Sequence, residues 1–385
     1  MTVTAPAGFV AAGLHCGIKE SGAPDLSLVA TSDGEAVPAA GVFTQNLACA
    51  GPVRVSKQHL LATGGHATAV VLNSGNANCA TGDDVEVAQE MCALTAEELG
   101  CAADDVLVCS TGLIGIPLDL GPLQRGIPDL TRARLGDERS GQAAARAIMT
   151  TDTAPKQAVV HGAGWIIGGM AKGAAMLAPN MATMLAVLTT DAALDPASLQ
   201  SMLGNAAAHS FNRIVVDGCT STNDSVLLLA NGVAGAPDQG EFAAALDQAC
   251  ESLAMQMVRD AEGHTKVVTI VVDEARSADE AERAARRLAA SLLVKSSFYG
   301  SDPYWGRVLS ELGVSNIAMD TERVTIAYDD VVVAKGLAPT GADASSIAAR
   351  PEFTLTCKLG AGAQRYHVHT NDLSHGYIDE NMRTS

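Results

Sequence analysis

The sequence has few aromatic residues, no long apolar run and too few basic residues to balance its acidic ones. Aromatic residues make up only 3% of the 385 residues, so alanine, valine and leucine must fill most of the interior. No apolar stretch reaches the roughly 18 residues of a membrane-spanning helix, which argues against a membrane protein. The first six residues lack the basic and apolar regions of a signal peptide, so we expect a cytoplasmic protein.

Acidic residues outnumber basic ones by 43 to 25, which gives a net charge of −18. This charge argues against nucleic-acid binding, because such binding depends on neutralising phosphates with basic side chains. An acidic protein that handles an anionic amino acid needs local cations. The candidates are Lys172, Arg213, Lys295 and Arg307.

The nine cysteines form no Cys-x-x-Cys pair and are odd in number. We therefore expect reduced cytosolic thiols rather than a disulfide framework or a zinc site. Cys109 and Cys219 are expected to be small buried residues. His367 and His369 share one side of an expected strand, but no third ligand is nearby, so we expect solvent-facing histidines and no metal.

Apolar periodicity alternates between helix and strand, while the Rossmann glycine fingerprint and the Walker loop are both missing. The pattern indicates an α/β protein and gives no support to a dinucleotide-binding fold. The expected helices are 84–99, 141–149, 195–208, 241–258 and 277–293. The expected strands are 69–72, 106–109, 165–169, 183–190, 265–272, 323–328, 331–334, 352–358 and 365–370.

The segment Lys172–Leu185 contains a threonine, Thr183, that follows a small residue inside an apolar run. A threonine at a chain start is a good nucleophile, because its own amine can take the hydroxyl proton. The α-amino pKa is ordinarily roughly 7.7–8.0, and a nearby Lys172 would lower it by like-charge repulsion. From this segment alone, a buried strand with an incidental threonine stays open.

Further motifs follow one another along nearly the whole chain. They are Asn73–Asn78, Ser110–Gly115, Met149–Thr153, Lys172–Leu185, Phe211–Arg213, Asp217–Asp224, Glu262–Lys266 and Asp302–Arg307. Each is weak alone, but in this order they resemble the glutamate N-acetyltransferase / ornithine acetyltransferase family of arginine biosynthesis. The resemblance implies a layered α/β fold with helices outside the sheets.

The resemblance also implies that the chain cleaves itself between Ala182 and Thr183. The Thr183 hydroxyl would attack the Ala182 carbonyl, and water would hydrolyse the resulting ester. The products would be an alpha chain, 1–182, and a beta chain, 183–385. Thr183 would then take an acetyl group from N2-acetylornithine and pass it to glutamate, with ping-pong kinetics.

Other site residues are implied by the same resemblance. Thr111 and Gly112 match the family's oxyanion hole, where backbone N–H groups would stabilise a developing negative charge. The matched substrate-binding residues are Thr150, Lys172, Thr183, Glu262, Asn381 and Ser385. From the residues alone, an ordinary strand-to-turn Thr-Gly pair, a capping role for Thr150 and a solvated helix-end Glu262 also stay open.

The C-terminal residues Tyr377–Ser385 depart from the family's usual ending. Asn381 fits the family's binding asparagine. The last hydroxyl contact should fall one residue beyond Ser385, so Thr384 or Ser385 must supply it if it is present. The departure leaves the acceptor amino acid open.

Two donor schemes and a second enzyme class remain open from the sequence. The enzyme needs no bound cofactor, but it could accept acetyl-CoA as a co-substrate for direct acetylation of glutamate. A self-processing amidohydrolase or aminopeptidase with the same N-terminal threonine is the alternative, and a non-catalytic binding protein is a third possibility. The resemblance implies a heterotetramer of two alpha and two beta chains.

Overall fold

The computed structural model of the protein describes residues 2–177 and 184–382, which form two compact units. The first unit contains the described residues up to Asn212 together with Cys219–Met257. The second unit contains Arg213–Gly218 and the described residues from Val258 onward. The unit boundaries therefore differ from the predicted cleavage at Ala182–Thr183, which lies outside the described residues.

Two sheets build the described part of the first unit. A four-stranded sheet has the order β1 (Phe9–Leu14), β2 (Leu26–Thr31), β5 (Ala69–Asn76) and β6 (Val106–Leu113). A six-stranded sheet has the order β4 (His66–Ala67), β3 (Val37–Phe43), β11 (Ser225–Gly235), β9 (Leu185–Ala192), β8 (Ile166–Lys172) and β7 (Lys156–His161).

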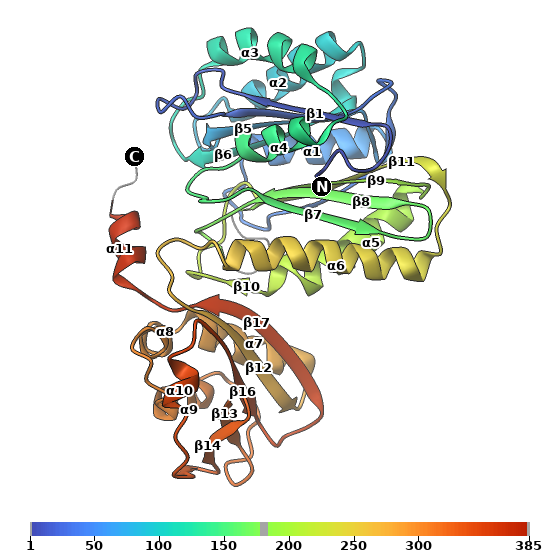
Figure 1. Ribbon diagram of the computed structural model, residues 1–385. Helices are drawn as coiled ribbons and strands as arrows, with labels where there is room; N and C mark the ends of the chain where they lie inside the picture. Colours follow the sequence, from blue (N-terminus) through green and yellow to red (C-terminus); the bar gives the residue numbers. More distant parts are fainter. Residues whose placement is uncertain (1, 178–183, 383–385) are drawn as a thin grey trace. The chain divides into compact units, whose positions relative to one another are not determined.

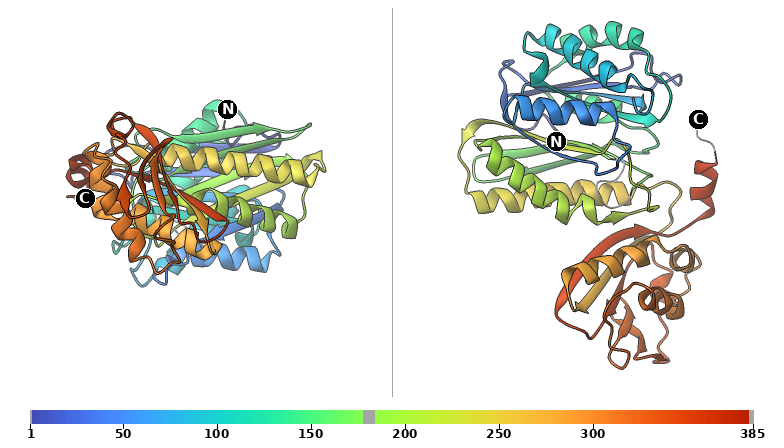
Figure 2. Two further views of the ribbon diagram at one scale, coloured as in Figure 1. Left: turned by 90° about the horizontal axis from the view of Figure 1, so that it is seen from below. Right: turned by 180° about the vertical axis from the view of Figure 1, so that it is seen from behind.

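Helices cover the outer faces of both sheets, as Figures 1 and 2 show. On the four-stranded sheet lie α2 (Asp84–Leu99) and α3 (Leu120–Ala133), whose buried side chains share a core with the sheet's strands. On the six-stranded sheet lie α5 (Pro196–His209) and α6 (Gln239–Val258). The described residues of the first unit also form α1 (Gly51–Ala62), α4 (Glu138–Ala147) and the 3₁₀ turn η1 (Ala103–Asp105), and a second 3₁₀ turn, η2 (Phe211–Arg213), ends at the unit boundary.

A second apolar core joins the two sheets of the first unit. Residues of β5 and β6 pack there with residues of β8, β9 and β11, and α4 contributes small alanines. The fold of the first unit is thus the layered α/β arrangement with helices outside sheets that the family resemblance implied.

The second unit is built on a seven-stranded mixed sheet. Its order is β10 (Ile214–Val215), β17 (Gln364–Asn371), β12 (Val267–Ala275), β16 (Glu352–Lys358), β13 (Thr325–Tyr328), β14 (Val331–Lys335) and β15 (Ala338–Pro339). Its core joins the sheet to α7 (Ala278–Ala290) and α9 (Trp305–Gly313). The unit also contains α8 (Leu292–Tyr299), α10 (Ser345–Ala348) and α11 (His375–Asn381).

The structure corrects several local expectations. The helix predicted at 277–293 ends at Ala290, because the Ser291 side chain accepts the Val294 N–H and starts α8. Cys219 is exposed rather than buried. His369 is only 7% exposed, so it is not the solvent-facing strand histidine that we expected. No helix among the described residues is long and apolar enough to cross a membrane.

Candidate active site

Lys172 and Thr111 are two of the predicted site residues, and the structure brings them into contact. Lys172 is the last residue of β8, and Thr111 lies near the end of β6. The Lys172 Nζ donates a hydrogen bond of 3.3 Å to the Thr111 Oγ1. Each residue is only 2% exposed. A buried ammonium group has lost its hydration, so polar or oppositely charged groups nearby must compensate its charge.

Asp152 supplies the opposite charge near Lys172. Its carboxylate forms an ion pair with Lys156 and accepts backbone N–H groups from Thr150, at 3.0 Å, and Gly173, at 2.8 Å. Burial alone would raise the Asp152 pKa, but the charges of Lys172 and Lys156 and the hydrogen bonds outweigh it. The pKa of Asp152 therefore lies at about 2, and the carboxylate stays ionised.

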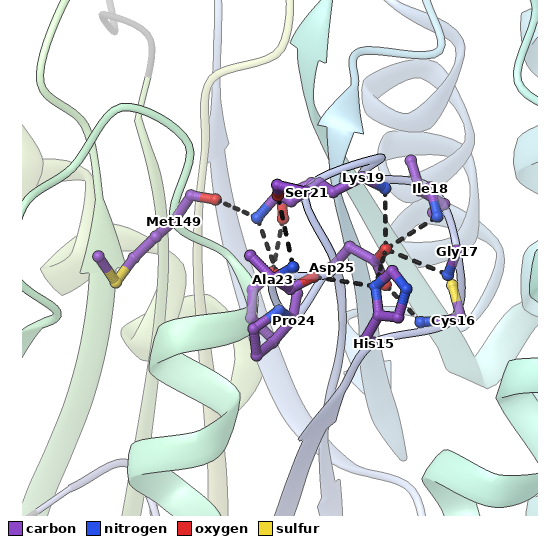
Figure 3. Close-up of polar contacts among 12 residues, drawn as sticks. His15, Cys16, Gly17, Ile18, Lys19, Ser21, Ala23, Pro24, Asp25 and Met149 are labelled. Atoms are coloured by element: carbon purple, nitrogen blue, oxygen red, sulfur yellow. Dashed lines mark hydrogen bonds and ion pairs between the residues drawn. The ribbon is translucent and has the colours of Figure 1, made fainter.

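Thr150 is held by its backbone rather than by a helix cap. Its N–H donates to Asp152, and the cap position of α4 is Ile148. The carbonyl of the preceding residue, Met149, accepts the Lys19 Nζ at 2.6 Å, as Figure 3 shows. Burial and the charge of Lys172 both lower the Lys19 pKa, although Asp25 and Asp152 act in the opposite direction. Lys19 thus connects an N-terminal loop to the Thr150 segment.

That loop is organised by Asp25, as Figure 3 shows. The buried Asp25 carboxylate accepts four consecutive backbone N–H groups, at 2.6–3.2 Å, from Cys16, Gly17, Ile18 and Lys19. Burial raises the Asp25 pKa, but the hydrogen bonds from the loop dominate and hold it below its usual value. The carboxylate fills the concavity that these amides form, and so it fixes the position of Lys19.

Thr111 and Gly112 lie inside β6, which runs one residue further to Leu113, rather than in the turn after it. Gly112 has a φ of +137°, and a Cβ added there would lie 2.3 Å from the Gly75 carbonyl carbon and 2.4 Å from the Asn76 nitrogen. The close approach of β5 therefore requires glycine at this position. Both residues line a cavity of about 40 Å³, together with Ala77, Ile114, Met176 and residues 221–223.

Several motif residues around this cavity have structural partners. Asn223 Nδ2 donates to the carbonyls of Ala77, at 2.6 Å, and Ser110, at 2.9 Å. The Ser110 hydroxyl donates to Asn73 Oδ1. These bonds join the Asp217–Asp224 motif to the ends of β5 and β6. The asparagines and serines that stand out in the sequence thus hold the walls of the cavity together.

The described residues on either side of the expected cleavage point are fixed by sheet pairing. Lys172 at the end of β8 pairs with Leu185 at the start of β9. The Met184 N–H donates to Asp224 Oδ1 at 3.0 Å, and the Met184 carbonyl accepts the Ser225 N–H at 3.2 Å. Ala182 and Thr183 themselves, which the sequence predicts as the cleavage pair, lie outside the described residues.

The second unit brings together two predicted site residues that are 119 positions apart. Asn381 Nδ2, in the last turn of α11, donates to Glu262 Oε2 at 2.7 Å. Glu262 is only 8% exposed, so the alternative of a solvated glutamate is wrong. Its backbone neighbourhood is tight, because a Cβ on Gly263 would lie 2.1 Å from the Tyr377 nitrogen. Ser385, the third expected contact in this region, lies outside the described residues.

Glu262 also lines a cavity of about 100 Å³ within the second unit. Lys295 lies at this cavity and donates to Thr370 Oγ1 at 2.9 Å and to the Asn371 carbonyl. Burial lowers the Lys295 pKa to about 8, although Asp372 and Asp217 oppose the shift. Of the four candidate cations, Lys295 is therefore the one that lines this cavity together with Glu262.

The other two candidate cations have partners of their own. Arg213 lies 3.0 Å from His367 Nδ1 and stacks over the Tyr366 ring, 5.0 Å from its centroid. Arg307 is half-buried and donates to the Leu293 carbonyl at 3.0 Å. Both serve the second unit's own structure. Within residues 2–177 and 184–382, no group of three or more His, Cys, Asp or Glu side chains could hold a metal ion.

Sequence reasoning missed three residues that the structure places around Lys172. Lys19 sits in a Gly- and Ser-rich loop and carries no motif signal. Asp152 and Asp224 belong to the motifs Met149–Thr153 and Asp217–Asp224, but neither was among the predicted contacts. The signal in the sequence was an aspartate inside a Thr-rich motif, for Asp152, and an aspartate at the end of a Ser- and Thr-rich motif, for Asp224.

The comparisons with known proteins agree with the resemblance seen in the sequence. A family model described as the ArgJ family matches residues 10–384. An "Arginine biosynthesis bifunctional protein ArgJ" of Mycolicibacterium paratuberculosis is 46% identical, over 100% of this chain and 96% of the relative. A protein of the same name from Streptomyces coelicolor is 44% identical over the whole of both chains. A solved ornithine acetyltransferase from Mycobacterium tuberculosis, complexed with ornithine, has a TM-score of 0.44 and 44% identity, covering 46% of this chain and 94% of its own.

Proposed function

The chain belongs to the ArgJ family of arginine biosynthesis, and we propose from this that it carries the acetyl group of N2-acetylornithine to glutamate on Thr183. The products are ornithine and N-acetylglutamate. The observation that carries the proposal is the pairing of Lys172 with Leu185, two residues after Thr183, while Lys172 contacts Thr111. This pairing supports the proposal because it places Leu185, two residues after the expected nucleophile, on the strand next to Lys172.

Processing comes first in the proposed scheme. The Thr183 hydroxyl attacks the Ala182 carbonyl carbon, a C–O bond forms, and the C–N bond between the two residues breaks. The hydroxyl proton ends on the Thr183 nitrogen, which becomes an amine. Water then hydrolyses the ester between the two chains, so that Thr183 carries both a free hydroxyl and a free amine.

Transfer follows in two matched halves. The Thr183 amine takes the hydroxyl proton as the oxygen attacks the acetyl carbonyl of N2-acetylornithine, and ornithine leaves with that proton. Glutamate then attacks the acetyl-Thr183 ester through its amine and restores the free hydroxyl. Thr111 and Gly112 are proposed to stabilise the negative oxygen in both halves, where one donor contributes about 3 kcal/mol.

The proposed substrate contacts pair each charged group of the substrate with a side chain of the opposite charge. Lys172 is suited to the substrate carboxylate, and we propose that it also lowers the pKa of the Thr183 amine by like-charge repulsion. Glu262 is suited to the cationic amine of ornithine, with Asn381 orienting it and Ser385 contributing a hydroxyl. Thr150 is proposed as a further hydroxyl contact beside Asp152.

Acetyl-CoA is proposed as a second donor, because the curated relatives are named bifunctional. No bound cofactor is required, since the acetyl group is carried by Thr183 itself. We also propose that the enzyme is cytoplasmic and assembles as two alpha and two beta chains. The amidohydrolase alternative differs in letting water resolve the acyl-enzyme, and acetate release without glutamate would favour it.

The test of the proposal is a Thr183→Ala variant of the full chain. We expect intact mass spectrometry to find two chains, 1–182 and 183–385, in the parent protein and a single chain in the variant. We also expect the variant to transfer no acetyl group from N2-acetylornithine to glutamate. An active parent that stays as one unbroken chain would contradict the proposal.

A further inference from the structure

Asp224 is a buried carboxylate that the proposed mechanism does not use. It is 0% exposed and lies one residue before β11 in the six-stranded sheet. Its Oδ1 accepts the N–H of Met184, the residue that directly follows Thr183. Its Oδ2 is buried and has no hydrogen-bond partner among the described residues. An unpartnered buried polar atom is costly, so its retention calls for an explanation.

The backbone next to Asp224 is also hydrogen-bonded to Met184. The Ser225 N–H donates to the Met184 carbonyl, and Ser225 pairs with Leu185 in the parallel ladder of β11 and β9. Both backbone polar groups of Met184 are therefore held from residues 224 and 225. Only the Met184 N–H, the one nearer to Thr183, is held by a side chain.

We propose that Asp224 is a positioning residue for Thr183, which it orients by fixing the Met184 N–H during both processing and acetyl transfer. The inference rests on the proposed function, because it assumes that Thr183 is the reacting residue. Peptide units are planar and nearly rigid, so fixing the N–H of Met184 also fixes the plane of the peptide bond that joins Met184 to Thr183. A nucleophile must be held near its attack geometry to react efficiently.

The charge state of Asp224 fits a positioning role. Burial raises the Asp224 pKa well above 3.8, and the Met184 N–H, Ser221 and the charge of Lys172 only partly oppose this. Burial therefore favours the neutral form of the carboxyl group over the charged one. An asparagine has the same shape, carries no charge and keeps an oxygen that can accept the Met184 N–H.

The experiment compares the full chain carrying Asp224→Asn, Asp224→Ala or Asp224→Leu with the parent and with Thr183→Ala. Processing is followed by intact mass spectrometry after expression, and folding is checked by thermal unfolding. We expect Asp224→Asn to process within a few-fold of the parent rate. Asp224→Ala should process about tenfold more slowly or worse, as loss of one hydrogen bond at a reacting segment would give. Asp224→Leu fills the space without an acceptor, and it replaces the alanine variant if that variant does not fold.

Asp191, near the far end of β9 from Met184, offers a matched control. Asp191 is also buried, and it accepts the backbone N–H groups of Ala7, at 3.2 Å, and Ile166, at 2.8 Å. Seven residues of extended chain place it roughly 23 Å from Met184. Asp191→Ala loses comparable backbone contacts, so it should lower stability while processing at the parent rate.

Steady-state kinetics on the processed fraction separate positioning from a purely structural role. We expect Asp224→Ala to lower kcat per acetylatable Thr183 by about tenfold, with KM for N2-acetylornithine near that of the parent. Loss of folded enzyme would instead reduce the number of acetylatable sites and leave kcat per site unchanged.

The possible outcomes distinguish this inference from the proposed function. If Thr183→Ala is cleaved, or if the parent is active without cleavage, the proposed function fails and this inference fails with it. If Thr183→Ala stays intact but folded Asp224→Ala and Asp224→Leu process at the parent rate, only the role of Asp224 is overturned. Equal slowing in Asp224→Asn and Asp224→Ala would also overturn it, because a retained acceptor would then be insufficient.

Discussion

At the scale of single residues, the charges around Lys172 are balanced by a carboxylate that lies outside the expected set. Asp152 pairs with Lys156 and holds the N–H groups of Thr150 and Gly173 on either side of the site. It therefore fixes the segment that contains Thr150 and the residue that follows Lys172. Burial shifts Asp224 toward its neutral form, whereas Asp152 stays ionised and offsets the lysine charge.

The low pKa of Asp152 predicts a pH dependence of stability. Because the folded-state pKa of about 2 lies below the ordinary 3.8, the ionised carboxylate stabilises the fold above about pH 4. That contribution is lost as the pH falls through about 2. We expect Asp152→Asn to lower the free energy of unfolding at neutral pH by at least about 2 kcal/mol, with the difference shrinking in acid.

Urea denaturation of Asp152→Asn and the parent at several pH values measures this effect. Asp330→Asn, at an exposed aspartate in the second unit, serves as the control and should differ little from the parent at any pH. A deficit in Asp152→Asn that does not change between neutral pH and pH 3 would show that the carboxylate charge is not the cause.

The residues that the sequence identified and those it missed differ in a physical way. Thr111, Lys172, Glu262 and Asn381 belong to motifs and fall into two contacting pairs, Lys172 with Thr111 and Glu262 with Asn381. Lys19 could not be found this way, because its position depends on the loop that Asp25 folds through four backbone N–H groups. Such contacts depend on the folded backbone and leave no spacing in the sequence.

At the scale of elements, the close approach of β5 and β6 fixes the backbone of the predicted oxyanion hole. Gly75 pairs with Gly112 at a register irregularity next to Asn76. A side chain on Gly112 would overlap the backbone of β5, so the strands would have to separate. The geometry of Thr111 and Gly112 thus depends on two glycines on adjacent strands.

We expect Gly112→Ala to destabilise the protein by about 1–3 kcal/mol or more and to impair processing and transfer together. Gly115→Ala is the matched control, because Gly115 also has a positive φ, +80°, but an added Cβ there meets nothing within 4 Å. Both variants incur the strain of a positive φ, so their difference isolates the contact with β5. Thermal unfolding and the acetyl-transfer rate measure it, and equal effects in the two variants would refute the contact argument.

The elements themselves were partly predictable. The apolar stripe of α2 gave the bounds Asp84–Leu99 correctly, because a long amphipathic helix has a strong period and its C-cap Gly100 stops it. The helices α1, α3, α9, α10 and α11 were missed. The α3 helix contains an internal proline and α1 begins with Gly51-Pro52, so neither presents the usual pattern. The α7–α8 boundary depends on the Ser291 cap, which periodicity does not show.

At the scale of the whole molecule, the predicted cleavage would pass through the middle of one sheet. In the six-stranded sheet, β9 and β11 belong to 183–385, whereas β3, β4, β7 and β8 belong to 1–182. The two beta-chain strands, β9 and β11, pair with each other, and each also pairs with a strand of the alpha chain. The alpha-chain partner of β9 is β8, and that of β11 is β3. The core between the two sheets likewise contains residues from both chains.

This arrangement predicts that the cleaved protein behaves as one molecule. Separating the chains would expose the edges of β3, β8, β9 and β11 and divide a shared core, which is as costly as unfolding the first unit. We expect the two chains to elute together at a one-to-one ratio in native size exclusion and to separate only in denaturant. The uncleaved Thr183→Ala protein should elute at the same position as the cleaved parent. Separation of the parent's chains in native buffer would contradict the shared-sheet argument, even if acetyl transfer were intact.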